Sequence, residues 1–563
     1  MKNKFGRLLA LALAGVSVGS MAACKGNSGG GGVDELQIFV SHYGYGVDWV
    51  DDLIEAFKQE SWVKEKYEKA GRTISIAIPV SDRERSLPIK YIEDGYTNYD
   101  LVFSCDLGTK LEDTMDSKIL YEDLTSLWQT TIPGESITVE KKMKASFVDS
   151  ADRDMSEGVM YKEFPWVGGT YGFVYNKHLV DTYLGADYEM PKTTYELIEM
   201  GNALNATTGA PKLVLANKEA SYWSGGAFQL FWGQYSGEEK LWDYHNGQDE
   251  NGNYTVEALK DQGRLRALEA IEEILVRKDA TSGEYVNLSS YYKAYGVAQG
   301  DFLRGKGVMM AMGDWFDLEM EAFKSDPNNA AYIDPNTDIR WMRNPILSAM
   351  VETLDLYTAG KEYSALTNEE KAYWDAKLVA IIDAVDAGAT SLEGVSASDF
   401  SKVQSARGCK TVLGGHVAYI PGYADAKDLA KDFLLFMASN KGIETFMKST
   451  DGCSTAFNYS VDKNSELWNG FSEMQKVKIQ EDEISSSWYV GRGYTTKLTF
   501  TGLFSGSYAF GETKNKTLES MFCSEAASDR MSSLAIYESA YNYFSANNNK
   551  QWNNLLLEAG VSN

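Results

Sequence analysis

The N-terminal part of the chain alternates between short apolar runs and one amphipathic segment. Leu36–Val40 and Thr73–Ile78 have the apolar pattern of buried strands. Between them, one face of a helix is predicted from the positions of Val50, Leu53, Ile54 and Phe57. The order strand, helix, strand predicts a parallel pair with a right-handed crossover, and therefore an α/β fold.

A third apolar run, Leu101–Phe103, ends at a polar segment that contains Asp106. In open α/β sheets, ligands bind outside the carboxyl ends of the strands. The loops that follow the first and third strands are therefore candidates for ligand contact. The first of these loops contains His42 and Tyr43.

Residues 163–180 predict a crossing from one domain to another. Phe164–Gly169 is apolar but contains a proline and two glycines, which favours an extended segment over a helix. Thr170–Tyr175 then alternates aromatic and β-branched residues with small ones, as a strand does. The α/β pattern restarts beyond it, with a helix start at Pro191–Thr194 and a strand at Lys212–Ala216.

Two later segments complete the predicted organisation. Asp301–Trp315 contains a glycine-bounded apolar strand that ends at an aromatic residue, which predicts a second domain edge. Residues 350–408 predict a helical insertion, because Thr367 and Glu370 have the spacing of a capping box. The segment Thr411–Pro421 predicts a return to strand.

The N-terminus has the pattern of a bacterial lipoprotein signal. A basic start and the apolar run Leu8–Val18 are followed by small residues up to Ala23, directly before Cys24. We therefore expect residues 1–23 to be a signal peptide and Cys24 to be lipidated, with residues 24–32 as a glycine-rich linker. The alternative is a secretory signal with an incidental cysteine. Either interpretation places the folded body outside the cytoplasm, and the first tethers it to the bacterial cell membrane.

Charge and cysteine content narrow the possible partners. The net charge of -26 disfavours nucleic acid and anionic lipid surfaces as partners. No CxxC pair or other metal-ligand spacing is present, so we expect no metal and no cofactor. The four cysteines beyond the signal are predicted to be free, mostly buried thiols: Cys105, Cys409, Cys453 and Cys523.

Four segments, in order, resemble landmarks of the family 1 extracellular solute-binding proteins of bacterial ABC importers, the maltose-binding-protein-like family. FPWVGGTYGFVYNKHLV is similar to the family's first hinge crossing, and PKTTYELI is similar to the helix start that follows it. FLRGKGVMMAMGDW resembles the crossing back. GGHVAYIPGYADAKDLAKDFLLFMAS resembles a strand and helix in the closing half of the family pattern.

The resemblance implies a two-lobe, periplasmic-binding-protein-like α/β fold in which each lobe uses discontinuous chain and a hinge joins the two. Lobe I is expected at 33–165 and 315–450, with the insertion 350–408 inside it, and lobe II at 168–312 and 455–563. The family function implies capture of a sugar, here an oligosaccharide, and delivery to ABC transporter permease subunits. We expect the protein to be a monomer.

Aromatic residues near the predicted lobe edges suit a sugar ligand. A sugar ring has an apolar face that can lie on an aromatic ring, while its hydroxyls require polar partners. The candidate ligand-binding residues are His42, Tyr43, Asp106, Trp166, Gly169, Tyr222, Trp223, Asp314, Trp315, Trp488 and Tyr489. Trp315 stands at the family's stacking position. Core packing for the other aromatics, a loop or capping role for the acids, and backbone geometry for Gly169 are the alternatives.

No sequence signature of catalysis is present, including G-x-S-x-G, HExxH or a P-loop, so we expect a binding protein and not an enzyme. Two alternatives stay open. A surface adhesin could bind glycans without a transport role. A glycoside hydrolase needs only two carboxylates that are close in space, and an acidic chain offers many.

Overall fold

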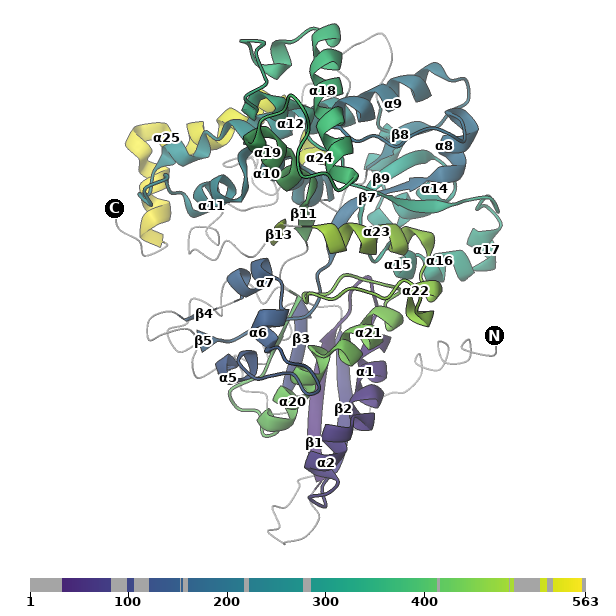
Figure 1. The fold of residues 1–563 in the computed structure, drawn as a ribbon, viewed down its shortest axis with the longest axis vertical. Helices are drawn as coiled ribbons and strands as arrows, with labels where there is room; N and C mark the ends of the chain where they lie inside the picture. The colour runs from purple at the N-terminus through teal and green to yellow at the C-terminus, as the bar shows by residue number, and fades with distance from the viewer. Residues whose placement is uncertain are drawn as a thin grey trace.

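The computed structural model describes residues 33–82, 99–105, 121–151, 153–154, 160–216, 222–276, 285–412, 416–485, 487–490, 517–523 and 530–558. Two β-sheets lie one above the other along the long axis, and helices flank each sheet (Figure 1). The lower unit contains the N-terminal strands, and the upper unit contains most of the helices. We call them the first and second lobes.

The sheet of the first lobe begins with the predicted parallel unit. Its strands, in spatial order, are β2 (Thr73–Asp82), β1 (Val33–Ser41), β3 (Leu101–Cys105), β12 (His416–Tyr419) and β6 (Phe164–Pro165). β1 pairs in parallel with β2 and β3, whereas β12 is antiparallel to β3 and β6. The strand, helix, strand order predicted from the sequence is therefore confirmed for β1, α1 and β2.

Helices of the first lobe cover this sheet with apolar faces. On α1, Trp49, Val50, Leu53, Ile54 and Phe57 are buried. α1 packs against α20 and α21, which come from a region more than 370 residues later in the chain. The helices here are α1 (Asp48–Gln59), α2 (Ser61–Tyr67), α5 (Thr125–Trp128), α6 (Val139–Lys142), α7 (Ala145–Ser150), α20 (Lys427–Met437) and α21 (Asn440–Ser449), beside the ribbon β4 (Arg153–Asp154) and β5 (Met160–Tyr161).

The sheet of the second lobe is built around β7. Its strands are β13 (Ser487–Val490), β11 (Cys409–Val412), β7 (Thr170–Asn176), β9 (Gly307–Gly313) and β8 (Lys212–Leu215), with β10 (Ile339–Met342) also paired to β7. All seven residues of β9 are buried, which explains its uninterrupted apolar sequence.

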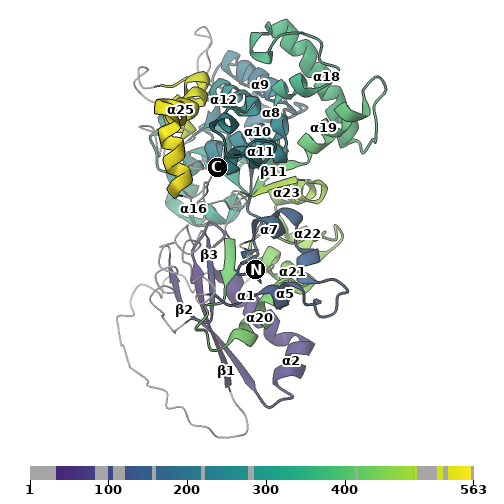
Figure 2. The ribbon, with the colours of Figure 1, turned by 90° about the vertical axis from the view of Figure 1, so that its left-hand side faces the viewer.

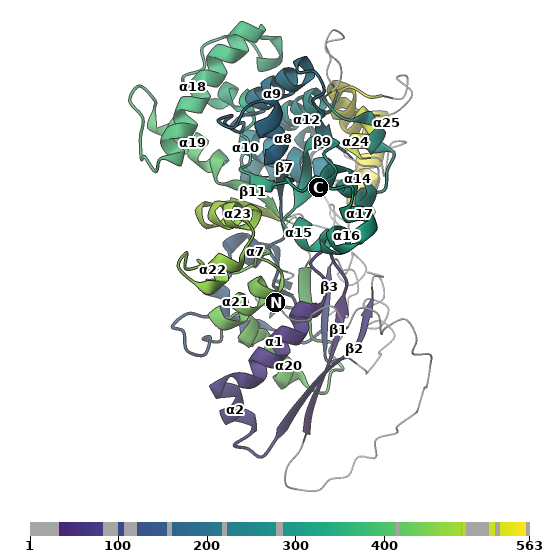
Figure 3. The ribbon, with the colours of Figure 1, turned by 90° about the vertical axis from the view of Figure 1, so that its right-hand side faces the viewer.

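Helices on both sides enclose the second sheet. α18 and α19 lie on one side of the second lobe and α25 lies on the opposite side (Figures 2 and 3). The helices of this lobe are α8 (Lys177–Tyr183), α9 (Thr194–Ala206), α10 (Phe228–Ser236), α11 (Glu238–Asn246), α12 (Gln262–Leu275), α13 (Leu288–Tyr291), α14 (Tyr295–Leu303), α18 (Asn368–Asp386), α19 (Ala397–Arg407), α24 (Leu518–Phe522) and α25 (Ser533–Glu558), preceded at α10 by a π-helical turn, Tyr222–Ala227.

Short helices lie between the two lobes in Figure 1: α15 (Phe316–Glu319), α16 (Glu321–Ser325), α17 (Pro327–Ala330), α22 (Glu466–Gly470) and α23 (Glu473–Ile484). Along the described ranges, none of the helices is sufficiently long and apolar to traverse a lipid bilayer. Cys409, Cys453 and Cys523 are free and buried, as predicted. The side chain of Cys105, and Cys24 with the whole predicted signal and linker, lie outside the described residues.

The predicted lobe boundaries are wrong for residues 339–412. These residues were expected in the first lobe, but β10 and β11 both pair with β7 in the second sheet. The insertion 350–408 follows them, because its buried residues belong to the hydrophobic cluster of the second lobe. Conversely, Phe457 and Phe471, expected in the second lobe, belong to the cluster that contains the first-lobe core.

Thr411–Pro421 was predicted as one strand, but it spans two strands in different sheets. β11 belongs to the second sheet and β12 to the first, so the chain crosses between the lobes here. The other crossings were found correctly. β6 ends in the first sheet and β7 begins in the second, and β9 leaves the second sheet at Gly313.

The insertion is fastened to the second lobe through a buried carboxyl group. The capping box of Thr367 and Glu370 is present at the start of α18, as predicted. Further along α18, Asp375 is 3% exposed and accepts hydrogen bonds from the hydroxyls of Thr193 (3.0 Å) and Ser348 (2.8 Å). Thr193 also caps α9. Burial raises the pKa of Asp375 to about 7.

We expect Asp375→Asn to change how folding stability depends on pH. A carboxyl group whose pKa is raised in the folded state contributes stability at low pH and loses it as the pH rises towards 7. The free energy of unfolding of the variant should therefore improve relative to the parent by on the order of 2 kcal/mol between pH 5 and pH 8. Urea unfolding at both pH values measures this difference. If the free energies of unfolding of variant and parent differ by the same amount at pH 5 and pH 8, the pKa of Asp375 is not raised by burial.

Candidate functional site

Backbone hydrogen bonds join three of the segments that pass between the lobes. Gly168 N donates to Ser454 O at 2.7 Å, and Asp314 N donates to Thr170 O at 3.0 Å. A Cβ atom at Gly168 would lie 2.8 Å from the Cβ of Ser454, so only glycine allows this approach. Gly169 has a φ of 50°, in the left-handed region that favours glycine. The glycines of the first crossing therefore serve backbone geometry.

A buried group of charges lies against these crossings. Lys478 on α23 has no exposed side-chain surface, and its Nζ lies 3.5 Å from Asp314 Oδ2 and 3.4 Å from Asp482 Oδ2. Asp314 Oδ2 also accepts the backbone N–H of Ser454 at 2.7 Å. Lys410 on β11 completes the group, with Nζ 2.6 Å from Asp482 Oδ1. We call Asp314, Lys410, Ser454, Lys478 and Asp482 the hinge cluster.

Mutual attraction favours the ionised forms of Lys478 and Asp482. Burial alone would lower the pKa of Lys478, but the carboxylates of Asp482 and Asp314 outweigh it and raise that pKa. Burial likewise favours the neutral form of Asp482, yet Lys410 and Lys478 hold its pKa far below the usual range. The hydroxyl of Ser454 donates to Asp482 Oδ2 at 2.6 Å. The cluster thus ties α23 and β11 to the crossing strands.

Asp314 was predicted as an acceptor for ligand hydroxyls, and its surroundings contradict that role. The side chain is fully buried and engaged with Ser454 and Lys478. Its place in the chain nevertheless fixes the next residue, Trp315, at the point where the chain leaves the second sheet.

Trp315 lies between residues of the two lobes. Its ring packs against the backbone of Gly44, in the loop after β1, so closely that a Cβ there would lie 2.3 Å from a ring carbon. From the second lobe, the rings of Tyr171 and Tyr222 lie 5.8 and 6.4 Å away between centroids. The Trp315 indole also forms a hydrogen bond with the Tyr222 side chain.

The loop after β1 extends this aromatic surface into the first lobe. The half-buried ring of Tyr43 lies 4.7 Å from the ring of His416 on β12, and the hydroxyl of Tyr45 forms a hydrogen bond with His416 Nδ1. His42, predicted as a ligand contact, is half-buried in the same loop. We call Tyr43, Tyr171, Tyr222 and Trp315 the aromatic strip. Both lobes contribute to it, and three of its four members, Tyr43, Tyr222 and Trp315, were sequence candidates.

Glu319 adds a carboxylate to one end of the strip. It lies one helical turn after Trp315, and its backbone N–H donates to the Trp315 carbonyl at 3.0 Å. Its side chain is half-buried and accepts hydrogen bonds from Gln299 Nε2, at 2.7 Å, and from the Tyr295 hydroxyl. Burial raises the pKa of Glu319, and these two donors oppose the shift. After burial, Glu319 is the next largest cause of the raised pKa of Tyr222.

Two predicted tryptophans belong to the cores. Trp166 is 3% exposed and stacks on Trp49 of α1 at 4.2 Å between ring centroids. Trp223 is 2% exposed in the cluster of the second lobe, beside Phe173 at 5.5 Å. Neither tryptophan is part of the aromatic strip. Both were predicted as ligand contacts because aromatic residues that pack in a core and aromatic residues that contact a ligand look the same in a sequence.

The remaining candidates are not described at the level of side chains. Trp488 and Tyr489 lie on β13, which places their backbone in the second sheet. Asp106 lies outside the described residues. Tyr171, Gln299 and Glu319 were not among the sequence candidates. Tyr171 lay within the predicted strand of the first crossing, and Glu319 stands four residues after Trp315, at the spacing that puts two residues on one helical face.

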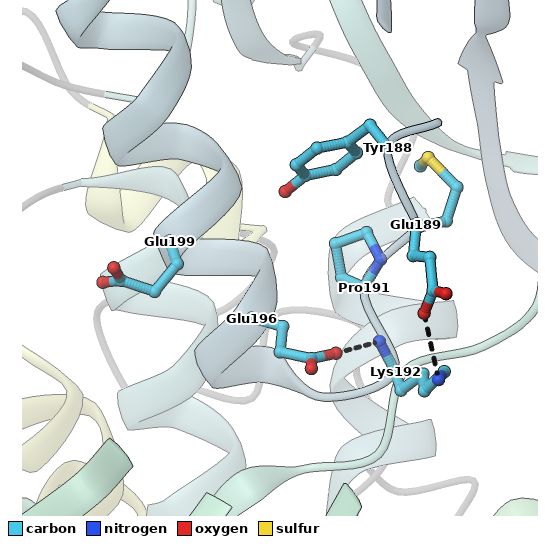
Figure 4. A pocket seen from close by; sticks show the side chains of 7 residues that line it. Tyr188, Glu189, Pro191, Lys192, Glu196 and Glu199 are labelled. Carbon is cyan, nitrogen blue, oxygen red and sulfur yellow. Dashed lines mark hydrogen bonds and ion pairs between the residues drawn. The ribbon is translucent and has the colours of Figure 1, made fainter. Parts of the chain in front are cut away.

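A pocket of about 270 Å³ lies elsewhere, in the second lobe before and along α9 (Figure 4). It is lined by Tyr188, Glu189, Met190, Pro191, Lys192, Glu196 and Glu199. Two of the glutamates are engaged locally: Glu196 accepts the backbone N–H of Lys192 at 2.7 Å, and Glu189 pairs with Lys192 Nζ at 3.4 Å. Within the described ranges, no group of three or more His, Cys, Asp and Glu side chains could hold a metal ion.

Comparisons with known proteins agree with this geometry. Residues 89–350 match the family described as bacterial extracellular solute-binding protein. No curated protein matches the chain in sequence.

Solved structures share the fold at low identity. A probable secreted solute-binding lipoprotein from Streptomyces coelicolor is 11% identical with a TM-score of 0.53, over 91% of this chain and 99% of that chain. A chitin oligosaccharide binding protein is 12% identical with a TM-score of 0.52, over 91% and 98%. The apo-form of RafE from Streptococcus pneumoniae is 13% identical with a TM-score of 0.52, over 92% and 98%. The predicted two-lobe, periplasmic-binding-protein-like α/β fold is confirmed.

We expect Lys478→Met to destabilise the protein by about 3–5 kcal/mol, because it leaves the carboxylates of Asp314 and Asp482 buried without their shared cation. Lys476→Met is the matched control. Lys476 lies on the same helix, but its ion pair with Glu473 is partly exposed, so its loss should cost less than about 1 kcal/mol. Urea unfolding followed by tryptophan fluorescence compares the two. Equal, small effects would show that the hinge cluster does not hold the lobes' crossings together.

Proposed function

Because residues 89–350 match the family of bacterial extracellular solute-binding proteins, we propose that the protein captures a neutral oligosaccharide between its two lobes. The observation that carries the proposal is the position of Trp315, whose ring lies between Gly44 of the first lobe and two tyrosines of the second. A ligand that stacks on this ring would contact both lobes at once, and its binding would favour the closed arrangement.

The chemistry of the aromatic strip supports a sugar over other solutes. Its rings offer flat apolar faces, and the hydroxyls of Tyr43, Tyr171 and Tyr222 add donors and acceptors along the same surface. Glu319 is positioned to accept hydroxyl donors at one end. The structural neighbours include a chitin oligosaccharide binding protein and a protein described in work on xylan utilization, both of which suggest the class of ligand to try first.

We also propose a role in transport, which is the usual role of the family that residues 89–350 match. The closed lobes would deliver the sugar to the permease subunits of an ABC importer, with the protein held at the outer face of the cell membrane by a lipid on Cys24. We propose no catalytic role. The two alternatives, a glycan-binding adhesin and a glycoside hydrolase, predict different outcomes in the same experiments.

We expect the purified protein to bind one neutral oligosaccharide per chain and to leave it intact. A thermal-shift screen against malto-, xylo-, chito- and galacto-oligosaccharides identifies the ligand, because saturation at about 100 times its dissociation constant adds about 2.7 kcal/mol of stability. Chromatography of the incubated sugar then tests for turnover. Shorter products in proportion to protein would support the hydrolase. An unchanged radius of gyration in small-angle scattering with saturating sugar would support the adhesin.

We expect Trp315→Ala to weaken binding of that sugar at least about 20-fold, because a central tryptophan anchor commonly contributes about 2 kcal/mol or more. Calorimetry measures the affinity, and unfolding of the ligand-free protein measures stability. Trp223→Phe is the control, since Trp223 packs in the core of the second lobe and its replacement should change affinity less than about threefold. Parent-like affinity of Trp315→Ala together with a stability loss of about 3–5 kcal/mol would identify Trp315 as a core residue.

A further inference from the structure

An exposed apolar surface lies beside the aromatic strip on the second lobe. Tyr292, Tyr295 and Val297 are 44%, 39% and 51% exposed, and they fall within one short stretch between the end of α13 and the start of α14. Tyr291, which is buried, supports the ring of Tyr292 edge-on at 5.1 Å between centroids. We call Tyr291, Tyr292, Tyr295 and Val297 the tyrosine shelf. Other large exposed apolar residues of the described chain, such as Tyr332 and Tyr373, stand apart in sequence.

The shelf is joined to the strip through Glu319. The hydroxyl of Tyr295 forms a hydrogen bond with the Glu319 carboxylate, and Gln299, one turn further along α14, donates to the same carboxylate at 2.7 Å. Tyr222 of the strip is affected by the same carboxylate, because the charge of Glu319 helps to raise the pKa of Tyr222. Glu319 therefore links the backbone of Trp315, at the lobe junction, to Tyr295 and Gln299 of α14, next to the exposed surface.

Open space and local charge pairing favour a neutral ligand on the shelf. A Cβ at Gly296, between Tyr295 and Val297, would meet no atom within 4 Å. The lysine within the shelf, Lys293, forms an ion pair with the buried Asp301. Asp301 also pairs with Lys306 at 2.7 Å. The lysine within this stretch is therefore already engaged in an ion pair, and what the shelf presents outward is aromatic surface.

We propose that the tyrosine shelf binds the outer rings of an oligosaccharide whose first rings lie on the aromatic strip. The inference rests on the proposed function and adds the length of the substrate to it: the protein prefers chains that extend beyond the lobe junction over mono- and disaccharides. Stacking on exposed tyrosine faces suits sugar rings, and their outward hydroxyls stay in water. Continuity with the strip is the reason to assign a sugar, and not a protein partner, to this surface.

The test compares short and long ligands in the parent and in Tyr292→Ser/Tyr295→Ser. Calorimetry uses chains of two to six rings from whichever of the malto-, xylo-, chito- and galacto- series the parent binds. The parent's affinity should rise about tenfold or more from two to six rings, and the double variant should lose that gain while it binds two rings within about threefold of the parent.

One further variant separates direct stacking of the sugar on Tyr292 from an effect through Tyr295 and Glu319, and a second variant is its control. Tyr292→Ser leaves the bond between Tyr295 and Glu319 in place, so it should lose part of the length gain and nothing for two rings. Tyr332→Ser is the matched control, because Tyr332 is 72% exposed on another segment, and it should bind every length as the parent does.

Each contrary result has a distinct meaning. An equal loss for short and long chains would overturn the inference, because the shelf would then act on the strip through Glu319. An unchanged length profile in the double variant would overturn it as well. A parent that binds no sugar in any series would overturn the proposed function, and the inference with it, whereas the first two results leave the proposed function standing.

Discussion

The structure depends on one ammonium group that is buried between two carboxylates. Lys478 has no exposed side-chain surface, and burial of such a charge without partners would be prohibitive. Asp314 and Asp482 supply the partners only when α23 and the segment after β9 are held together. Because Ser454 joins the same group from a third segment, the cluster forces three distant parts of the sequence to meet at the lobe junction.

The position of Trp315 and its aromatic neighbours follows from this constraint. Asp314 is the last residue before Trp315, so a carboxylate fixed in the hinge cluster fixes the origin of the indole next to it. Gly44 and Gly313 then allow the ring to pack where any side chain would collide with it. The result is a closely packed ring at the point where the lobes meet, with Gly44 of the first lobe and Tyr171 and Tyr222 of the second lobe around it.

Local patterns in the sequence were sufficient for much of this arrangement. The first crossing is visible because Pro165 and two glycines interrupt an apolar run, and Trp315 is visible because a glycine-bounded strand ends at it. The lobe to which β10 and β11 belong was not visible in the sequence, because both strands are defined by pairing with β7, more than 160 residues earlier. Asp314 and Trp166 illustrate a second limit. An acid beside an aromatic, or a tryptophan at a lobe edge, has the same sequence signature whether it binds ligand, a buried lysine or another tryptophan.

Glu319 explains why the same surface should discriminate against anionic solutes. Its carboxylate is half-buried, which raises its pKa, and hydrogen bonds from Gln299 and Tyr295 offset part of that shift in favour of the ionised form. A hydroxyl can donate to such a group, whereas a phosphate or carboxylate would meet a like charge in a low-dielectric setting. Because Glu319 also forms a hydrogen bond with Tyr295, a carboxylate that selects a neutral ligand at the junction would also align the exposed tyrosine beyond it. Selection for charge and selection for length would therefore rest on one side chain.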